Sequence, residues 1–271
     1  MTPRASSSSA GTAKPPSLAA LRAALEGDGV SVRYQPVVRM ESREPAVMEV
    51  LARLSLADGT WLEPAAFVPR LEAAGLAWRL TQAVMRRCFA EWRAHDLARL
   101  GMALAINVPL DAMLRRGAAA WIEREAQAAA LPPSMLILEL TETRPVTDAP
   151  ALRAAMEQLR RPGWRLAIDD VGPAARALDH LLDMPFAALK LDKDLVAEAA
   201  ADSAAARHAV QQTVAAARAA GMRVVAEGIE DRATWRRMAA MGIDAAQGFL
   251  IARPMEATAL AAWRANWAQR P

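Results

Sequence analysis

The chain lacks the residues on which several classes of protein depend. It has a single cysteine, Cys88, among 271 residues, so an internal disulfide is excluded. The apolar neighbours of Cys88 predict a buried thiol, which is compatible with a reducing cytoplasm. The three histidines, His95, His180 and His208, are isolated from one another. Because no Ser-His-Asp arrangement stands out, we assign these histidines no chemistry.

Long apolar runs and a strong excess of one charge are also absent. No apolar run approaches the ~20 residues of a membrane-spanning helix, and the N-terminus has no signal-peptide core. Lys and Arg number 33 against 30 Asp and Glu, and the net charge of +3 is too small to argue for nucleic acid. We therefore expect a cytoplasmic protein with no membrane segment and no nucleic acid polymer as partner.

The residues that are present divide the chain into a tail and one domain. Residues 1–16 are rich in Ser, Thr, Ala and Pro, which predicts a flexible tail, and they contain no sensor, receiver or cyclase-like pattern. The hydrophobic content of 54% can fill a sizeable core. Since similar short units repeat over nearly all of residues 17–271, we expect one domain there.

Short apolar runs alternate with longer segments of helical periodicity. We expect strands at 32–38, 48–54, 103–108, 136–141, 165–170, 189–191, 224–229 and 245–250. We expect helices after an N-cap at Ser17 and at 64–74, 77–95, 151–160, 207–220 and 258–267. This alternation predicts an α/β fold with a parallel sheet, either closed as a (β/α)₈ TIM-type barrel or open and doubly wound. Pro36 in the first strand indicates an edge or an irregular end.

Two adjacent carboxylates, Asp169 and Asp170, follow the short apolar run at 166–168. Within a regular strand they would point to opposite sides, but where a strand ends the chain turns and both can face one cavity. Adjacent carboxylates repel each other unless a cation screens them, so the pair suggests a divalent metal. The alternative is that one of the two merely caps the next helix.

The same pattern recurs along the chain and favours the metal. Other short apolar runs end in Glu49, Asn107, Glu139, Lys190 and Glu227. With Asp169 and Asp170, this makes five carboxylates and one amide oxygen at the ends of successive strands. Oxygen ligands of this kind suit Mg²⁺ or Mn²⁺, and there are enough of them for two ions that share an aspartate.

Taken in order, these motifs resemble the EAL-domain family of cyclic di-GMP phosphodiesterases over about residues 18 to 265. The matching segments are Tyr34-Gln35-Pro36, Glu49-Val50-Leu51 with Arg53, Phe67-Val-Pro69, Asn107, Glu139-Leu-Thr-Glu142, Asp169-Asp170, Lys190-Leu-Asp192, Ala226-Glu227-Gly228-Ile-Glu230 and Gln247-Gly248-Phe249. The resemblance implies a modified (β/α)₈ barrel whose first strand runs antiparallel to the others. It also implies Mg²⁺-dependent hydrolysis of cyclic di-GMP to linear pGpG.

The resemblance also implies a role for each matching residue. The first metal would be held by Glu49, Asn107, Glu139 and Asp169, and the second by Asp169, Asp170 and Glu227. The catalytic residues would be Lys190, Glu227 and Glu49. The substrate-binding residues would be Gln35, Leu51, Arg53, Asp192 and Gln247. Glu142 and Glu230 would anchor the loop that follows Asp170.

Two departures from the family pattern bear on activity. The signature Glu-Ala-Leu is Glu49-Val50-Leu51 here, a small apolar change that should leave the carboxylate in place. After Asp170 the family has Phe-Gly-Thr-Gly-Tyr-Ser-Ser, whereas this chain has Val171-Gly-Pro-Ala-Ala-Arg-Ala177. In the family this loop couples metal binding to dimerisation and activation, so we expect slow turnover, a weak homodimer at best, or activation by a regulatory protein partner.

The altered loop keeps other functions open. The main alternative to the enzyme is a receptor that binds cyclic di-GMP, or a protein-interaction module, without useful turnover. A barrel hydrolase for another phosphodiester is a third hypothesis. The presence of all six presumed ligands and of Lys190 favours the enzyme, because a receptor needs no catalytic apparatus.

Overall fold

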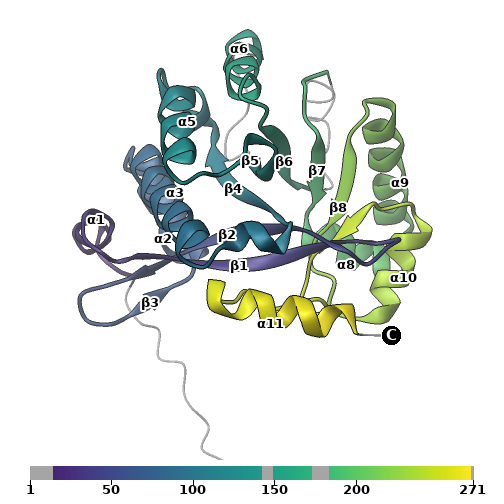
Figure 1. Ribbon diagram of the computed structural model, residues 1–271. Helices are drawn as coiled ribbons and strands as arrows, with labels where there is room; N and C mark the ends of the chain where they lie inside the picture. The colour runs from purple at the N-terminus through teal and green to yellow at the C-terminus, as the bar shows by residue number, and fades with distance from the viewer. Residues whose placement is uncertain (1–14, 142–148, 173–182, 270–271) are drawn as a thin grey trace, which may run out of the picture.

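Eight strands close into a barrel in the computed structural model, which describes residues 15–141, 149–172 and 183–269 (Figure 1). The barrel strands are β1 (Val30–Arg39), β2 (Pro45–Ser55), β4 (Ala103–Pro109), β5 (Leu136–Thr141), β6 (Arg165–Val171), β7 (Ala188–Leu191), β8 (Arg223–Ala226) and β9 (Ala245–Ala246). Their order is β1-β9-β8-β7-β6-β5-β4-β2, and pairing of β1 with β2 closes the ring. A short strand, β3 (Trp61–Leu62), extends β2 outside the ring.

The first strand runs against all of its neighbours. β1 pairs antiparallel with both β2 and β9, whereas the other neighbouring pairs around the ring are parallel. The predicted barrel with an antiparallel first strand is therefore confirmed, and the open doubly wound sheet is wrong. Pro36 lies within β1, opposite Met48, and not at a strand end. β9 pairs with β1 only at Val38 and Arg39, so the missing N–H of Pro36 breaks no ladder on that side.

Helices surround the barrel (Figure 1). They are α1 (Leu18–Glu26), α2 (Pro64–Ala73), α3 (Ala77–Ala94), α4 (Leu110–Met113), α5 (Ala118–Ala128), α6 (Ala149–Arg160), α8 (Lys193–Ala200), α9 (Ala204–Ala219), α10 (Arg232–Ala240) and α11 (Ala257–Ala268). Ser17 caps α1 as predicted, because its hydroxyl accepts a hydrogen bond from the Ala20 N–H at 3.1 Å. Cys88 is buried on α3, also as predicted. Within the described ranges, no helix combines the length and apolar character needed to cross a membrane.

The main core lies between the strands and the helices, and a smaller apolar cluster lies inside the barrel. Ala103, Ala105, Ile137 and Ala167 are buried together inside the ring, apart from the larger core. Side chains in a strand alternate between faces, so these residues share the inward face with Asn107, Glu139 and Asp169 further along β4, β5 and β6. The small interior residues therefore lie directly beneath the polar groups at the carboxyl ends of the strands.

Two expectations about the elements need correction, and a third is untested over most of its length. The strands expected at 224–229 and 245–250 end earlier, at Ala226 and Ala246, because the chain then turns around the barrel rim. Asp169 and Asp170 lie within β6, and not in a loop beyond it. The tail expected at 1–16 lies outside the described residues as far as residue 14, so its flexibility stays a prediction. The carbonyl of Pro16 accepts a hydrogen bond from Arg70 on α2.

Candidate active site

A buried lysine occupies the centre of the carboxyl end of the barrel. The Nζ atom of Lys190 on β7 lies 3.1 Å from Glu49, 3.3 Å from Glu139, 2.9 Å from Asp169 and 2.6 Å from Glu227. Only 3% of its side chain is exposed, so these contacts replace nearly all of its hydration. One ammonium thus faces four carboxyl groups from four different elements.

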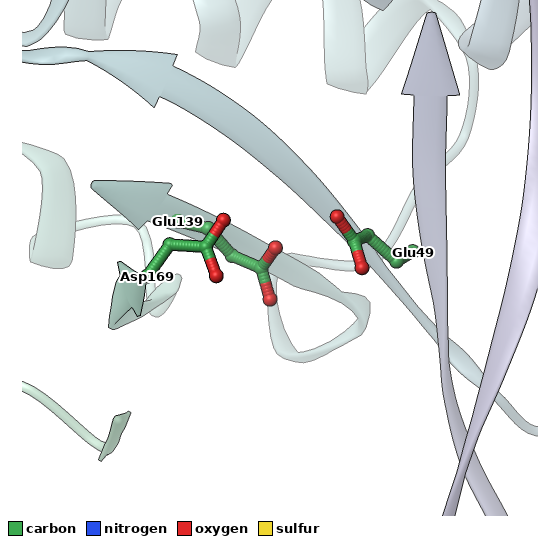
Figure 2. Close-up of side chains that lie close together, drawn as sticks. All are labelled: Glu49, Glu139 and Asp169. Carbon is green, nitrogen blue, oxygen red and sulfur yellow. The ribbon is translucent and has the colours of Figure 1, made fainter. Parts of the chain in front are cut away.

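The carboxyl groups form two overlapping groups that share Asp169. Oxygen atoms of Glu49, Glu139 and Asp169 lie within 4.8 Å of one another, and so do those of Asp169, Asp170 and Glu227. Figure 2 shows the first group, with the three carboxyl groups directed toward one space from separate strands. Each set offers the oxygen chemistry that a hard divalent cation prefers, and its oxygens lie close enough together that such an ion could be held. The residues that the sequence predicted as ligands therefore lie together.

A bulge in β6 turns both adjacent aspartates to the same site. The register between β6 and β7 shifts between Ile168 and Val171, and Asp170 has a φ of 57°. This left-handed conformation is uncommon for a residue other than glycine, and Asp tolerates it better than most. A bulge inserts an extra residue into one strand, so the usual alternation is interrupted and Asp170 joins the group with Asp169 and Glu227.

A chain of three amide side chains holds the Glu49 carboxylate in place. Asn107 Nδ2 donates to Glu49 Oε1 at 3.0 Å, and Gln247 Nε2 donates to Glu49 Oε2 at 2.7 Å. Gln247 also donates to Gln35 Oε1 at 3.1 Å, and Gln35 Nε2 donates to the carbonyl of Ala252 at 3.0 Å. The Oδ1 atom of Asn107 is buried and has no hydrogen-bond partner among the described residues. A buried oxygen in this state is costly, and a bound cation would satisfy it.

The electrostatics of the site also fit a cation. Burial and the neighbouring carboxylates raise the pKa of Asp170 to about 6 and that of Glu227 to about 8, against the opposing charge of Lys190. Burial likewise raises the pKa of Glu139 and of Asp169. For Glu49, burial raises the pKa, but Lys190 and the amide donors outweigh burial and leave the pKa low. One ammonium does not balance so many carboxyl groups, so added positive charge is favoured.

Two glycines allow the chain to pass close to the site. Gly228 follows Glu227 with a φ of 67°, and a Cβ there would lie 2.7 Å from the Cβ of Lys193. Gly248 follows Gln247, and a Cβ there would lie 2.2 Å from the carbonyl oxygen of Ile229. Larger residues would therefore displace the turns that set the positions of Glu227 and Gln247.

A cavity of about 320 Å³ opens beside the carboxylates. Asn107, Asp169 and Asp170 lie at one side of it, and apolar residues of β2, α2 and α3 form the other side. Leu51 is part of this apolar wall. The cavity is thus polar at the cation-binding groups and apolar opposite them, which is the pattern of a small-molecule site.

Arg53 lies near this cavity and is engaged by a residue that the sequence did not indicate. Its NH2 atom lies 3.0 Å from Glu63 Oε2, and its NH1 atom donates to the carbonyl of Ala52. Glu63 immediately precedes α2, but its side chain does not cap that helix. No sequence signal marks Glu63, because this pair depends on how the turn after β3 returns to β2.

The remaining predicted residues are less central or are not described. Asp192 accepts hydrogen bonds from the N–H groups of Asp194 and Leu195 and so caps α8. Glu230 is exposed after β8. Glu142, His180 and most of the altered loop at 171–178 lie outside the described residues. The proposed loop-anchoring role of Glu142 and Glu230 therefore stays a prediction.

The site geometry agrees with the result of comparing the chain with known families. A family model described as the EAL domain matches residues 18–254. The chain belongs to the EAL domain family. The proposed family membership is thereby confirmed, together with the barrel fold that the family implies.

Relatives of this EAL domain include named phosphodiesterases of Pseudomonas aeruginosa. The cyclic di-GMP phosphodiesterase PA2567 is 31% identical over 236 residues, which are 87% of this chain and 40% of the relative. The cyclic di-GMP phosphodiesterase RocR is 31% identical over 242 residues, or 89% of this chain and 61% of the relative. The chain thus spans less than two thirds of the length of these relatives.

One solved structure of the same family matches the fold of this chain over nearly all of its own residues. The structure described as the PaMucR phosphodiesterase in complex with c-di-GMP superposes with a TM-score of 0.82 at 30% identity. The alignment covers 90% of this chain and 98% of that chain. The fold of this EAL domain therefore matches nearly the whole of that structure.

Proposed function

We propose that this EAL domain is a Mg²⁺-dependent phosphodiesterase that hydrolyses cyclic di-GMP to linear pGpG. The observation that carries the proposal is the pair of carboxylate groups sharing Asp169, beside Lys190 and a cavity. The relatives named cyclic di-GMP phosphodiesterases supply the substrate class.

The oxygen donors suit two ions. Glu49, Asn107, Glu139 and Asp169 would hold one, and Asp169, Asp170 and Glu227 would hold the other. The buried Oδ1 of Asn107 supports the first set, and the close oxygens of Asp170 and Glu227 support the second. Bound Mg²⁺ would lower the pKa of a water molecule and neutralise charge on the phosphate. Mn²⁺ has the same ligand preference.

The chain's own residues would bind and orient the substrate. The guanidinium of Arg53 can hold two phosphate oxygens at once, because its donors form a planar fork. Leu51 and the apolar wall of the cavity would contact the base or ribose, and Gln35 and Gln247 would fix the position of Glu49. Asp192, at the start of α8, would lie on the other side of the pocket.

Lys190 and Glu227 would handle the protons and the developing charge. Lys190 Nζ, held between carboxylates, can donate to the attacking water or to a phosphate oxygen. A carboxylate oxygen of Glu227 can accept the proton of that water. The water oxygen bonds to phosphorus, one ester P–O bond breaks, and the products are a terminal phosphate and a free hydroxyl. Water and cyclic di-GMP thus give pGpG with no other reactant.

The test is incubation of the purified protein with cyclic di-GMP and Mg²⁺, followed by chromatography of the nucleotides. We expect pGpG to form and the chelated sample to form none. Tight binding of cyclic di-GMP without any product would instead favour the receptor hypothesis. A product from other phosphodiesters but not from cyclic di-GMP would refute the substrate assignment.

The sequence of the altered loop is the observation that favours the receptor. Pro173 supplies no N–H, and Ala174, Ala175 and Ala177 supply no hydroxyl to hold the loop after Asp170. If this slows the enzyme, rebuilding residues 171 to 178 to the family pattern should raise turnover and lower the Mg²⁺ requirement. A rebuilt protein that stays inactive while it binds cyclic di-GMP would support the receptor.

A further inference from the structure

A second cavity, of about 360 Å³, opens at the opposite end of the barrel. Three arginines from three different strands line it: Arg39 on β1, Arg165 on β6 and Arg223 on β8. In the order of the ring, β9 separates β1 from β8, and β7 separates β8 from β6. Side chains from alternate strands form one layer of a barrel, so the three guanidinium groups surround a common opening.

The register places these arginines beneath the candidate active site. Arg165 precedes Asp169 by four residues, Arg223 precedes Glu227 by four, and Arg39 follows Gln35 by four in the antiparallel strand. Even spacing keeps a side chain on the same face of a strand, so all three point inward like the site residues. At 3.3 Å per residue, the arginine layer lies about 13 Å from the active-site layer.

Small side chains leave the barrel open above the arginines. Ala103, Ala167, Ala188 and Ala245 line the cavity, where larger residues would close it. Its inner end is lined by Glu139 and Lys190, whose charges already oppose each other at 3.3 Å. The cavity therefore has room for a small ligand. The positive charge of the cavity that is not paired lies at its outer end.

Among the described residues that line this outer end, positive charge exceeds negative charge. Among the described residues, no carboxylate forms an ion pair with Arg39, Arg165 or Arg223. Asp244 also lines the cavity and offsets one of the three positive charges, and its Oδ2 atom accepts a hydrogen bond from the Val224 N–H at 2.7 Å. Arg165 donates to the carbonyl of Ser134 at 3.1 Å, which neutralises no charge.

The three arginines also affect one another. Burial lowers the pKa of Arg165, and the positive charges of Arg223 and Arg39 lower it further. Guanidinium groups that repel each other around a cavity are stabilised when an anion enters, and their planar donors match the oxygens of a phosphate. Three guanidinium groups and the Asp244 carboxylate leave two positive charges. A doubly negative ligand balances them better than a ligand with a single carboxylate would.

We propose that the cavity at the amino end of the barrel binds a phosphate group, as inorganic phosphate or as a small phosphate monoester, through Arg39, Arg165 and Arg223. The phosphate would lie at the outer end of this cavity, about 13 Å along the strands from the active-site layer, although Glu139 and Lys190 of that layer line the inner end. Its binding does not depend on the proposed hydrolysis. Its ligand would enter from the end of the barrel opposite to the substrate cavity.

The test is isothermal titration calorimetry of the metal-free full chain with inorganic phosphate and, separately, with glycerol 3-phosphate, at constant ionic strength. We expect saturable binding of one molecule per chain. Arg39→Gln, Arg165→Gln and Arg223→Gln should each weaken it roughly tenfold or more, the scale of a lost hydrogen bond to a charged group. Tighter binding of glycerol 3-phosphate would identify a monoester as the ligand, and tighter binding of phosphate would identify the free ion.

Two control variants distinguish binding at this site from general surface attraction and from binding in the substrate cavity. Arg264→Gln removes one positive charge from the exposed face of α11 and should leave phosphate binding within about twofold. Arg53→Gln removes the proposed phosphate-binding arginine beside the substrate cavity and should also leave phosphate binding at the second cavity unchanged. An equal loss in Arg264→Gln would mean general surface attraction, and a loss confined to Arg53→Gln would place the phosphate in the substrate cavity. Either result, or no saturable binding, would overturn the proposal.

A second measurement guards against variants that fail to fold. Without phosphate, Arg165→Gln should melt at the same temperature as the wild type or higher, because it removes repulsion. Phosphate should raise the Tm of the wild type and of Arg264→Gln, but not of Arg165→Gln. Arg165→Lys keeps the charge and loses the fork, so intermediate binding is expected. Full binding by Arg165→Gln would refute the site even if other variants unfold.

Discussion

The pair between Arg53 and Glu63 should restrain substrate binding by this EAL domain. Arg53, the proposed phosphate ligand, has only 10% of its side chain exposed, whereas Glu63 has 73% exposed. Their nitrogen and oxygen atoms are 3.0 Å apart, so an incoming phosphate must compete with the Glu63 carboxylate for the same guanidinium. Changing Glu63→Gln removes that competitor with little change in shape.

The size of the effect follows from the exposure of the pair. Because solvent screens Glu63, the pair is worth about 0.2–1 kcal/mol, the range for ion pairs with an exposed partner. Releasing this energy should lower the Kd of cyclic di-GMP by about 1.4- to 5-fold. The change should appear in KM and leave kcat nearly the same, since the phosphate contact is made in both the ground state and the transition state.

The Kd would be measured by calorimetry with Ca²⁺ in place of Mg²⁺, because we expect Ca²⁺ to bind and support little turnover. The matched control is Glu26→Gln, which makes the same change in an exposed pair with Arg79 between α1 and α3. A similar gain in this control would point to net charge and not to Arg53. Weaker binding by Glu63→Gln would refute the reasoning, since Glu63 would then help to position Arg53.

Three further predictions concern the metal-binding groups. Chelation should abolish hydrolysis of cyclic di-GMP and Mg²⁺ or Mn²⁺ should restore it; full activity in excess chelator would contradict a metal mechanism. Glu49→Ala should lower kcat by several orders of magnitude. Lys190→Ala should reduce kcat more than it weakens binding of cyclic di-GMP. Kinetics and calorimetry on the same samples would measure both effects. The metal-free protein should lose stability as the pH rises, because the pKa of Glu227 is raised from 4.5 to about 8 and that of Asp170 from 3.8 to about 6. Their neutral forms favour the folded state, and this contribution is complete below pH ~4 and lost between pH ~4 and ~8. Thermal melts should show a lower Tm at pH 8 than at pH 5, and Mg²⁺ should reverse this loss of stability. The loss should be smaller in Glu227→Gln. An equal loss in that variant would assign the pH dependence to other groups.

The sequence by itself determined the class of fold and the types of ligand. Apolar runs of strand length alternate with helical segments, and this is a local property that each stretch of chain carries. Residues such as Glu49 and Asn107 stand at the ends of these runs, so their shared position at one end of a parallel barrel could be predicted. Ser17 as an N-cap and Cys88 as a buried thiol were local predictions of the same kind and are confirmed.

Only the tertiary structure decided how these groups meet. The bulge that turns Asp170 toward Glu227 depends on the register between β6 and β7, which no local pattern sets. The contact of Glu63 with Arg53 depends on the path of the turn before α2. The layer formed by Arg39, Arg165 and Arg223 exists because strands far apart in sequence close into one ring. Pairings between distant segments are fixed by packing of the whole barrel, and for that reason the sequence determined which residues are available but not which of them share a cavity.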